Sequence, residues 1–100
     1  MKTTFREEDN NFVMEFEGRL DTVASLKTAE EMEVLYNSKG HDIILDLSKL
    51  EYISSSGLRL FLGLRKETVV KGGKVIIEHI SDDIKNVFTM TGFFNLFEIR

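Results

Sequence analysis

Two neighbouring stretches, IILDL at residues 43–47 and ISSSGLR at residues 53–59, decide the fold that this sequence predicts. The first stretch is apolar on both of its alternating faces, which is typical of a central strand covered by helices. The second places three serines and a glycine directly before a helical pattern that starts at about Leu58. The chain is therefore predicted to pass from a buried strand, through a polar turn, into a helix.

The polar turn at residues 54–57 has two interpretations. The start of a helix carries unpaired backbone N–H groups and the positive end of the helix dipole, and both favour an anion such as a phosphate. Alternatively, Ser54 or Ser55 only caps the helix. One cap needs one serine, and Gly57 is a poor residue in a first helical turn unless another group approaches closely. These two points favour a functional turn.

The elements before the turn are predicted from their periodicity. Strands at about residues 3–8 and 12–17 flank an Asp-Asn-Asn turn and form a hairpin, after which the chain leaves the sheet. A helix at about residues 22–37 begins at Asp21 or Thr22 as cap and carries Leu26 on its apolar stripe. A third strand at about residues 42–47 is followed by a loop at residues 48–53.

The elements after the turn complete an alternation of strands and helices. The helix at about residues 56–71 carries Val69 on its inner stripe, and a strand at residues 75–77 follows it. A third helix begins at Ser81 or Asp82, and a short strand at residues 96–99 ends the chain. The predicted fold class is α/β, with a mixed, largely parallel central sheet of about five strands and three or more helices in one domain over residues 1–100.

This topology predicts which loops meet. The second and third strands are expected to be parallel, so Gly18–Asp21 and Ser54–Gly57 lie at the same edge of the sheet, where ligand sites of parallel sheets are found. His79 and Asp82, which follow the fourth strand, are expected at this edge, further along it.

Composition excludes several classes of function. The net charge is −4 and no basic stripe is present, which disfavours direct nucleic-acid binding and favours a protein partner with a basic face. The chain has no cysteine, which fits a reducing cytoplasm, and no window approaches a membrane span.

Catalysis and metal binding are disfavoured as well. His41 is predicted at the far edge from Ser56, whereas His79 lies at the correct edge and stays open as a partner for a serine nucleophile. No oxyanion-hole signature and no orienting acid accompany these residues. Two distant histidines without cysteine do not form a metal site. We therefore expect a protein that is not an enzyme and that needs no cofactor or metal.

Three motifs carry a resemblance to the STAS domain family, and within it to the bacterial anti-sigma factor antagonists. Gly18-Arg19-Leu20-Asp21 resembles the Gly-x-Leu-Asp after the family's second strand, and residues 46–48 with 53–58 resemble its strand, loop and phospho-acceptor turn. Residues 90–97, MTGFFNLF, are similar to its Thr-Gly-x-x-x-x-Phe ending. The resemblance extends over essentially the whole chain.

The resemblance implies a switched binding module. Such proteins bind an anti-sigma factor that is also a serine kinase, which releases a sigma factor; phosphorylation ends the binding and a protein phosphatase restores it. The phospho-acceptor falls on Ser56, with Ser55 as the alternative. The partner-binding residues are expected to be Asp21, Ser54, Ser55, Gly57 and Arg59.

The alternative function is a phosphorylation-independent STAS adaptor subunit of a membrane transport or signalling complex. Such modules often lack a hydroxyl before the glycine of the turn, so Ser56 favours the switched module. The phenylalanines of the C-terminal segment are expected mostly to seal the sheet end, with Phe93 or Phe94 as candidate partner contacts.

Overall fold

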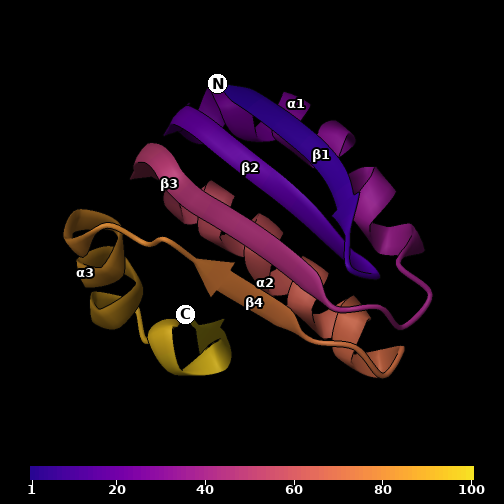
Figure 1. Ribbon diagram of the computed structural model, residues 1–100. Helices are drawn as coiled ribbons and strands as arrows, with labels where there is room; N and C mark the ends of the chain where they lie inside the picture. Colours follow the sequence, from indigo (N-terminus) through magenta and orange to yellow (C-terminus); the bar gives the residue numbers. More distant parts are fainter.

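Five strands form one sheet in which the order in space equals the order in the chain. The computed structural model describes all residues, 1–100. β1 and β2 are antiparallel, and every later neighbour is parallel, which confirms the predicted mixed, largely parallel sheet (Figure 1). The strands are β1 (Lys2–Glu8), β2 (Asn11–Leu20), β3 (Ile43–Ile53), β4 (Val75–Glu78) and β5 (Glu98–Ile99).

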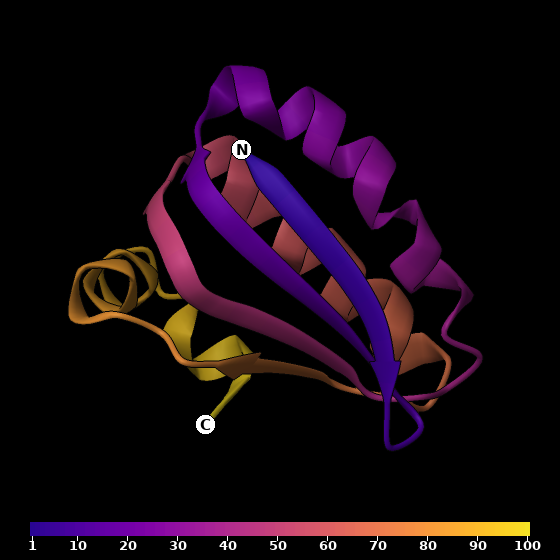
Figure 2. The ribbon, with the colours of Figure 1, turned by 45° about the horizontal axis from the view of Figure 1, so that its top comes forward.

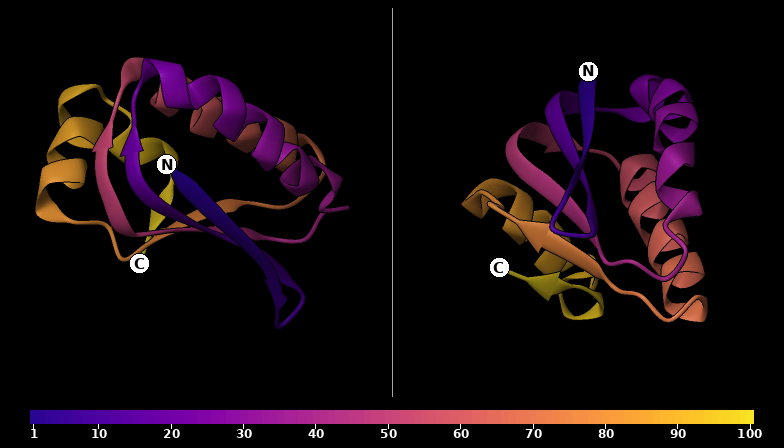
Figure 3. Two further views of the ribbon diagram at one scale, coloured as in Figure 1. Left: turned by 90° about the horizontal axis from the view of Figure 1, so that it is seen from above. Right: turned by 45° about the vertical axis from the view of Figure 1, so that its right-hand side comes forward.

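The helices α1 (Thr22–Glu31), between β2 and β3, and α2 (Ser55–Val70), between β3 and β4, lie together on one face of the sheet (Figures 2 and 3). The helix α3 lies beyond the end of β4 and packs alongside β3 (Figure 1). None of these helices combines the length and the apolar character that a membrane span requires. The helices are α1 (Thr22–Glu31), α2 (Ser55–Val70) and α3 (Asp82–Met90), with the 3₁₀ helices η1 (Met32–Asn37) and η2 (Phe94–Leu96).

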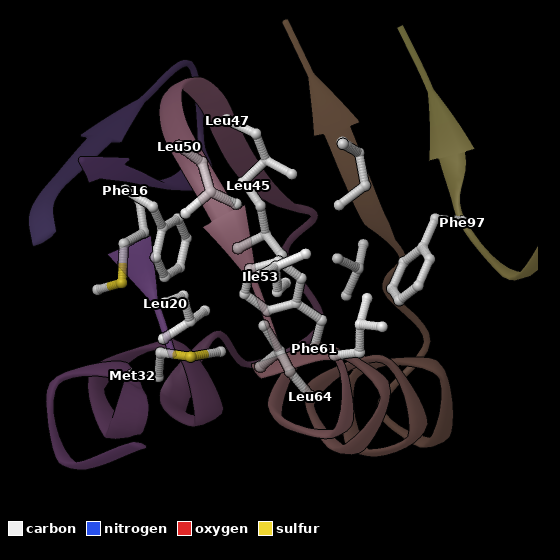
Figure 4. Packing of buried hydrophobic residues seen from close by; sticks show 14 of the residues in the cluster. Phe16, Leu20, Met32, Leu45, Leu47, Leu50, Ile53, Phe61, Leu64 and Phe97 are labelled. Atoms are coloured by element: carbon white, nitrogen blue, oxygen red, sulfur yellow. The ribbon is translucent and has the colours of Figure 1, made fainter. Parts of the chain in front are cut away.

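The main core lies between the sheet and the helices. Side chains alternate across a regular strand, so Met14 and Phe16 of β2 and Ile43, Leu45 and Leu47 of β3 point into this core. Phe16 and Phe61 meet in it edge to face, with ring centroids 5.2 Å apart (Figure 4). Leu20, at the end of β2, is fully buried in the same cluster.

Strands β2 and β3 are longer than the sequence patterns predict. Gly18, Arg19 and Leu20 stay in the sheet, and residues 48–53 continue β3 instead of forming a loop. The pattern was misleading because two register shifts interrupt the pairing. Glu15 and Glu17 face Asp46 and Lys49, and Gly18 and Arg19 face Leu50 and Tyr52, so β3 holds one extra residue at each place. A bulge of this kind breaks the alternation on which strand prediction depends.

The predicted helix at residues 22–37 divides into α1 and the 3₁₀ helix η1. Leu26 is 76% exposed, contrary to its predicted place in the apolar stripe, while Ser25 and Thr28 are buried. Met32 and Leu35 in η1 are buried as well. They follow Ser25 and Thr28 at intervals of three or four residues, so these four residues share the buried side of the helix.

On α2, Val69 is 49% exposed, because the buried side runs through Leu58, Phe61, Leu64 and Thr68. The predicted last strand at residues 96–99 shortens to β5, because residues 94–96 form the 3₁₀ helix η2.

The other face of the sheet has no helix and carries charged side chains. Val13, Ile44 and Ile76 pair across three strands and form a small separate cluster on this face. Because alternate residues share a face, Glu15 and Asp46 lie on it too. Glu15 pairs there with both an arginine and a lysine, at 3.4 Å and 3.0 Å. The buried central strand is therefore covered by helices on one face only.

Candidate functional site

The ends of β2 and β3 lie side by side and carry the predicted site. Leu20 and Ile53 are register partners, and the Ser54 N–H donates to the Leu20 carbonyl at 2.9 Å. Asp21 and Ser54 therefore leave the sheet next to each other, each as the first residue after its strand. This confirms the prediction that the two loops share one edge of the sheet.

Ser54 is the cap of α2. Its backbone is extended (φ −86°, ψ 170°), and its Oγ accepts a hydrogen bond from the Gly57 N–H at 3.2 Å. The Ser54 carbonyl accepts the first helical bond, from the Leu58 N–H at 3.0 Å. Ser54 is only 8% exposed. Its hydroxyl is thus committed to holding the start of the helix.

Gly57 allows α2 to begin against the ends of both strands. A Cβ at this residue would lie 2.8 Å from Leu20 Cγ and 2.9 Å from Ile53 Cγ1. Both of those side chains are buried in the core, so neither has room to move away. The glycine in the first turn is therefore explained by close approach, as the sequence indicated.

Two further serines occupy the first turn of α2. Ser55 is exposed and Ser56 is half-buried. The Arg59 Nη2 donates to the Ser56 Oγ at 3.3 Å. The first turn holds no acidic residue, so the positive end of this helix dipole has no negative side chain of its own. This is a place where an added negative charge is stabilised.

Asp21 caps α1 at the neighbouring strand end. Its Oδ1 accepts from the Ala24 N–H at 2.8 Å, and its carbonyl accepts from the Ser25 hydroxyl at 2.8 Å. Asp21 stays half-exposed. The starts of α1 and α2 thus form one surface with a carboxylate at one helix and, at the other, two serine hydroxyls that take no part in the cap.

His79 does not belong to this surface. Its Nδ1 lies 3.3 Å from Asp46 Oδ1, and β4 ends at Glu78, which faces Asp46. Between Asp46 and Ile53 the paired strand β2 advances by five residues (20 − 15) because β3 holds two extra residues, a distance of roughly 17 Å along a strand. The predicted edge is therefore stepped, and His79 lies too far from Ser56 to activate its hydroxyl.

Asp46 lies on β3 beside the last residue of β4, where it contacts His79. Burial raises the pKa of this carboxyl, but hydrogen bonds from Ser48 and the interaction with His79 outweigh burial, and the pKa is lowered. The Ser48 N–H donates to Asp46 Oδ1 at 3.0 Å. His79 has a positive φ of 59°, an uncommon conformation that turns the chain out of the sheet towards α3.

The remaining candidates lie apart from the serine turn. His41 packs edge to face on Phe12, with ring centroids 5.9 Å apart, before the start of β3. Phe88 and Phe97 are buried, with ring centroids 5.9 Å apart, whereas Phe93 and Phe94 are half-buried. Two phenylalanines thus seal the sheet end, as expected.

One contact at the site was missed by sequence reasoning. Arg59 was predicted as a partner-binding residue, but its hydrogen bond to Ser56 was not predicted. The spacing of three residues within a helix was the available signal, because residues at i and i+3 are neighbours on a helix surface.

The fold and the paired strand ends define a STAS domain. The STAS family profile matches residues 2–100, so this protein belongs to the STAS domain family.

Among its relatives are two proteins named anti-sigma-B factor antagonist. The protein from Listeria monocytogenes is 28% identical over 83 residues, covering 83% of this chain and 73% of the relative. The protein from Bacillus subtilis is 27% identical over 94 residues, covering 94% of this chain and 85% of the relative.

A solved structure shows the same fold. The anti-sigma factor antagonist SpoIIAA of Bacillus, in its unphosphorylated form, superposes with a TM-score of 0.75 at 20% identity, over 99% of this chain and 87% of that one. A structure of SpoIIAA in the phosphorylated form superposes with a TM-score of 0.73 at 21% identity, over 99% of this chain and 91% of that one.

Proposed function

We propose that this protein is an anti-sigma factor antagonist whose activity is switched off by phosphorylation of Ser56. It binds an anti-sigma factor that is also a serine kinase, and this binding releases a sigma factor in the cytoplasm. A protein phosphatase reverses the modification. The chain is the kinase's substrate and performs no catalysis itself. Its relatives carry the name of this class.

The observation that carries the proposal is the different position of the three serine hydroxyls. Ser54 uses its Oγ in the cap, whereas Ser55 and Ser56 have theirs outside the capping bond. Ser56 lies in a first turn without acidic residues, where a phosphate is stabilised by the helix dipole and by backbone N–H groups. Both Ser55 and Ser56 fit this description, and the family motif, in which the acceptor directly precedes the turn glycine, favours Ser56, with Ser55 as the alternative.

The proposed switch acts by charge at the binding surface. A phosphoserine adds nearly two negative charges beside a surface that already holds the Asp21 carboxylate. Even about 1.4 kcal/mol of unfavourable interaction reduces the affinity tenfold. The same phosphate is stabilised within α2, so the domain has no reason to refold.

Phosphorylation is tested with ATP and the cognate anti-sigma factor, which is the proposed serine kinase. Mass spectrometry should locate one phosphate on Ser56, and Ser56→Ala should abolish the modification while the matched control Ser55→Ala retains it. Modification only at Ser55, or at no serine of the turn, contradicts the assignment. Absence of any binding between the unmodified protein and the kinase favours a phosphorylation-independent adaptor.

The switch is tested by calorimetry with the same partner. Ser56→Ala should bind it with unchanged affinity, because the side chain loses only a hydroxyl. The variant should also resist inactivation by ATP, because it lacks the oxygen that accepts the phosphate. Loss of binding in this variant would make Ser56 a contact residue instead of a switch.

Asp21 is proposed as a partner contact in addition to its role as a cap. Asp21→Asn retains an oxygen that accepts from the Ala24 N–H but removes the charge, and asparagine is as good a cap as aspartate. We expect weaker partner binding or phosphorylation at an unchanged melting temperature. Unchanged binding and kinase constants would leave Asp21 with the capping role alone.

A further inference from the structure

Arg59 stands one helical turn after Ser56 and reaches back to it. The Arg59 Nη2 donates to the Ser56 Oγ at 3.3 Å. Residues three apart on a helix are surface neighbours, so the contact needs no movement of the backbone. At 3.3 Å this bond is slightly longer than the usual N–H···O range of about 2.7–3.2 Å.

The guanidinium of Arg59 has no carboxylate partner. The six ion pairs of the structure involve other residues. Arg6 and Arg100 pair with glutamates, Arg65 donates to a backbone carbonyl, and Arg19 lies over a tyrosine ring. Arg59 is thus the one arginine whose polar contact is a serine hydroxyl.

A phosphate would suit this guanidinium better than the hydroxyl does. Arginine presents a planar set of N–H donors that binds two phosphate oxygens at once, and such charge-assisted bonds are shorter and stronger than bonds to neutral groups. The first turn of α2 holds no acidic residue that would compete for the arginine.

We propose that Arg59 is the counter-ion of a phosphate on Ser56 and holds that phosphate against the first turn of α2. This inference rests on the modification proposed above. It gives phosphorylation two effects on the binding surface, because the new charge appears and the exposed arginine is at the same time withdrawn from the partner. Arg59 is therefore a positioning residue for the phosphorylated state.

The test uses full-length protein with phosphoserine installed at residue 56 during synthesis, so that it does not depend on any kinase. The second ionisation of the phosphate is followed by ³¹P NMR against pH. A free phosphoserine titrates near pH 6. With Arg59 the midpoint should lie lower, and Arg59→Ala should raise it by about 0.3–0.7 pH units, the range that one exposed ion pair gives.

Lys66→Ala is the matched control. Lys66 is exposed on the same helix, ten residues (66 − 56) from Ser56, or about 15 Å along the axis. Lys66→Ala removes one positive charge, as Arg59→Ala does, and should leave the titration midpoint within about 0.1 pH units of the parent value, since solvent screens a charge at that distance. Arg59→Lys should recover part of the shift. Equal midpoints for Arg59→Ala and Lys66→Ala would overturn the proposal.

A direct second readout separates this inference from the proposed function. In ¹⁵N spectra, the Arg59 side-chain N–H signals should shift on phosphorylation, and those of Arg65 should not. If these shifts appear while the kinase leaves Ser56 unmodified, the arginine–phosphate pair stands and the proposed function fails. If the kinase modifies Ser56 but neither readout responds to Arg59, the proposed function stands and this inference is wrong.

Discussion

The helices α2 and α3 begin in the same way and differ in charge. Each starts after a strand with a serine cap, whose Oγ accepts from the backbone N–H three residues on: Ser54 to Gly57 at 3.2 Å, and Ser81 to Ile84 at 3.3 Å. The first turn of α3 contains two aspartates, whereas that of α2 contains no acidic residue. The dipole of α3 is thus complemented by its own side chains, and that of α2 is left without a negative partner.

The two starts also differ in their packing. The residue that donates to the cap is Gly57 in α2 and the buried Ile84 in α3. Ile84 is itself part of the buried core, so the start of α3 has room for a large side chain, whereas the start of α2 has none. A serine cap alone therefore does not mark a functional site. The combination of a tight start and an uncompensated dipole distinguishes α2.

The largest expected effect comes from Gly57→Ala. Alanine is the better helix former, but its Cβ would lie 2.8 Å from Leu20 Cγ. We expect a loss of about 1–3 kcal/mol in the free energy of unfolding, as for other overpacked cores. Urea unfolding measures it. The control Gly63→Ala lies in the same helix with 3.6 Å to its nearest neighbour, and it should stabilise by about 0.5–1 kcal/mol. A neutral Gly57→Ala would remove the packing difference between the helices.

The next effect compares the caps themselves. Ser54→Ala should cost about 1–2 kcal/mol and Ser81→Ala about 0.5–1 kcal/mol, because the first removes a buried hydrogen bond and the second a partly buried one. Ser54 is 8% exposed, and Ser81 is exposed. Thermal unfolding of both variants decides the ranking. The reverse order would show that burial does not separate the two starts.

Asp46 contacts His79, which leads into α3, and the contribution of Asp46 to the free energy of unfolding should depend on pH. The pKa of Asp46 is lower in the folded chain than in the unfolded one, so folding favours the ionised form. Its contribution is therefore present above about pH 4 and is lost as the pH falls through the lowered pKa. Asp46→Asn should cost about 1 kcal/mol at pH 7 and progressively less below pH 4. The exposed Glu51→Gln serves as control and should show no such convergence with the parent.

The smallest effect tests the charge difference directly. Ser56 and Asp83 are the second residues of α2 and α3. Ser56→Asp should stabilise by about 0.3–1 kcal/mol at low ionic strength, and Asp83→Ser should destabilise by a similar amount. Both changes should shrink in 0.5 M salt, because salt screens surface charges. Equal melting temperatures of parent and variants at low salt would contradict the charge argument.

The sequence predicted the edge of the sheet that carries the site, but not its outline. The order of elements and the juxtaposition of Asp21 with the serine turn follow from two apolar strands and the helices between them. The position of His79 did not follow, because it depends on β4 ending seven residues before β3 (53 − 46). The length of a short parallel strand is decided by its neighbours, which the periodicity of its own residues does not contain.

Helix phase was the second limit of the sequence. Leu26 fits an apolar stripe, yet α1 buries Ser25 and Thr28 and leaves Val23 and Leu26 exposed. The side of the helix that faces the sheet is set by the Asp21 cap and by Met32 and Leu35 in the following 3₁₀ turn. Counting apolar residues cannot weigh these anchors against one exposed leucine.

The order of the strands has a consequence for how the chain folds. Each strand pairs only with the strands that precede and follow it in the sequence. Closing each pair therefore requires only the intervening turn or helix, and no segment has to insert between two strands that are already paired. Loop closure over short separations carries a smaller entropic barrier. During synthesis, β1 and β2 can pair while the rest of the chain is still being made. Each later strand can then add to the edge formed by the strand before it, in the order of synthesis.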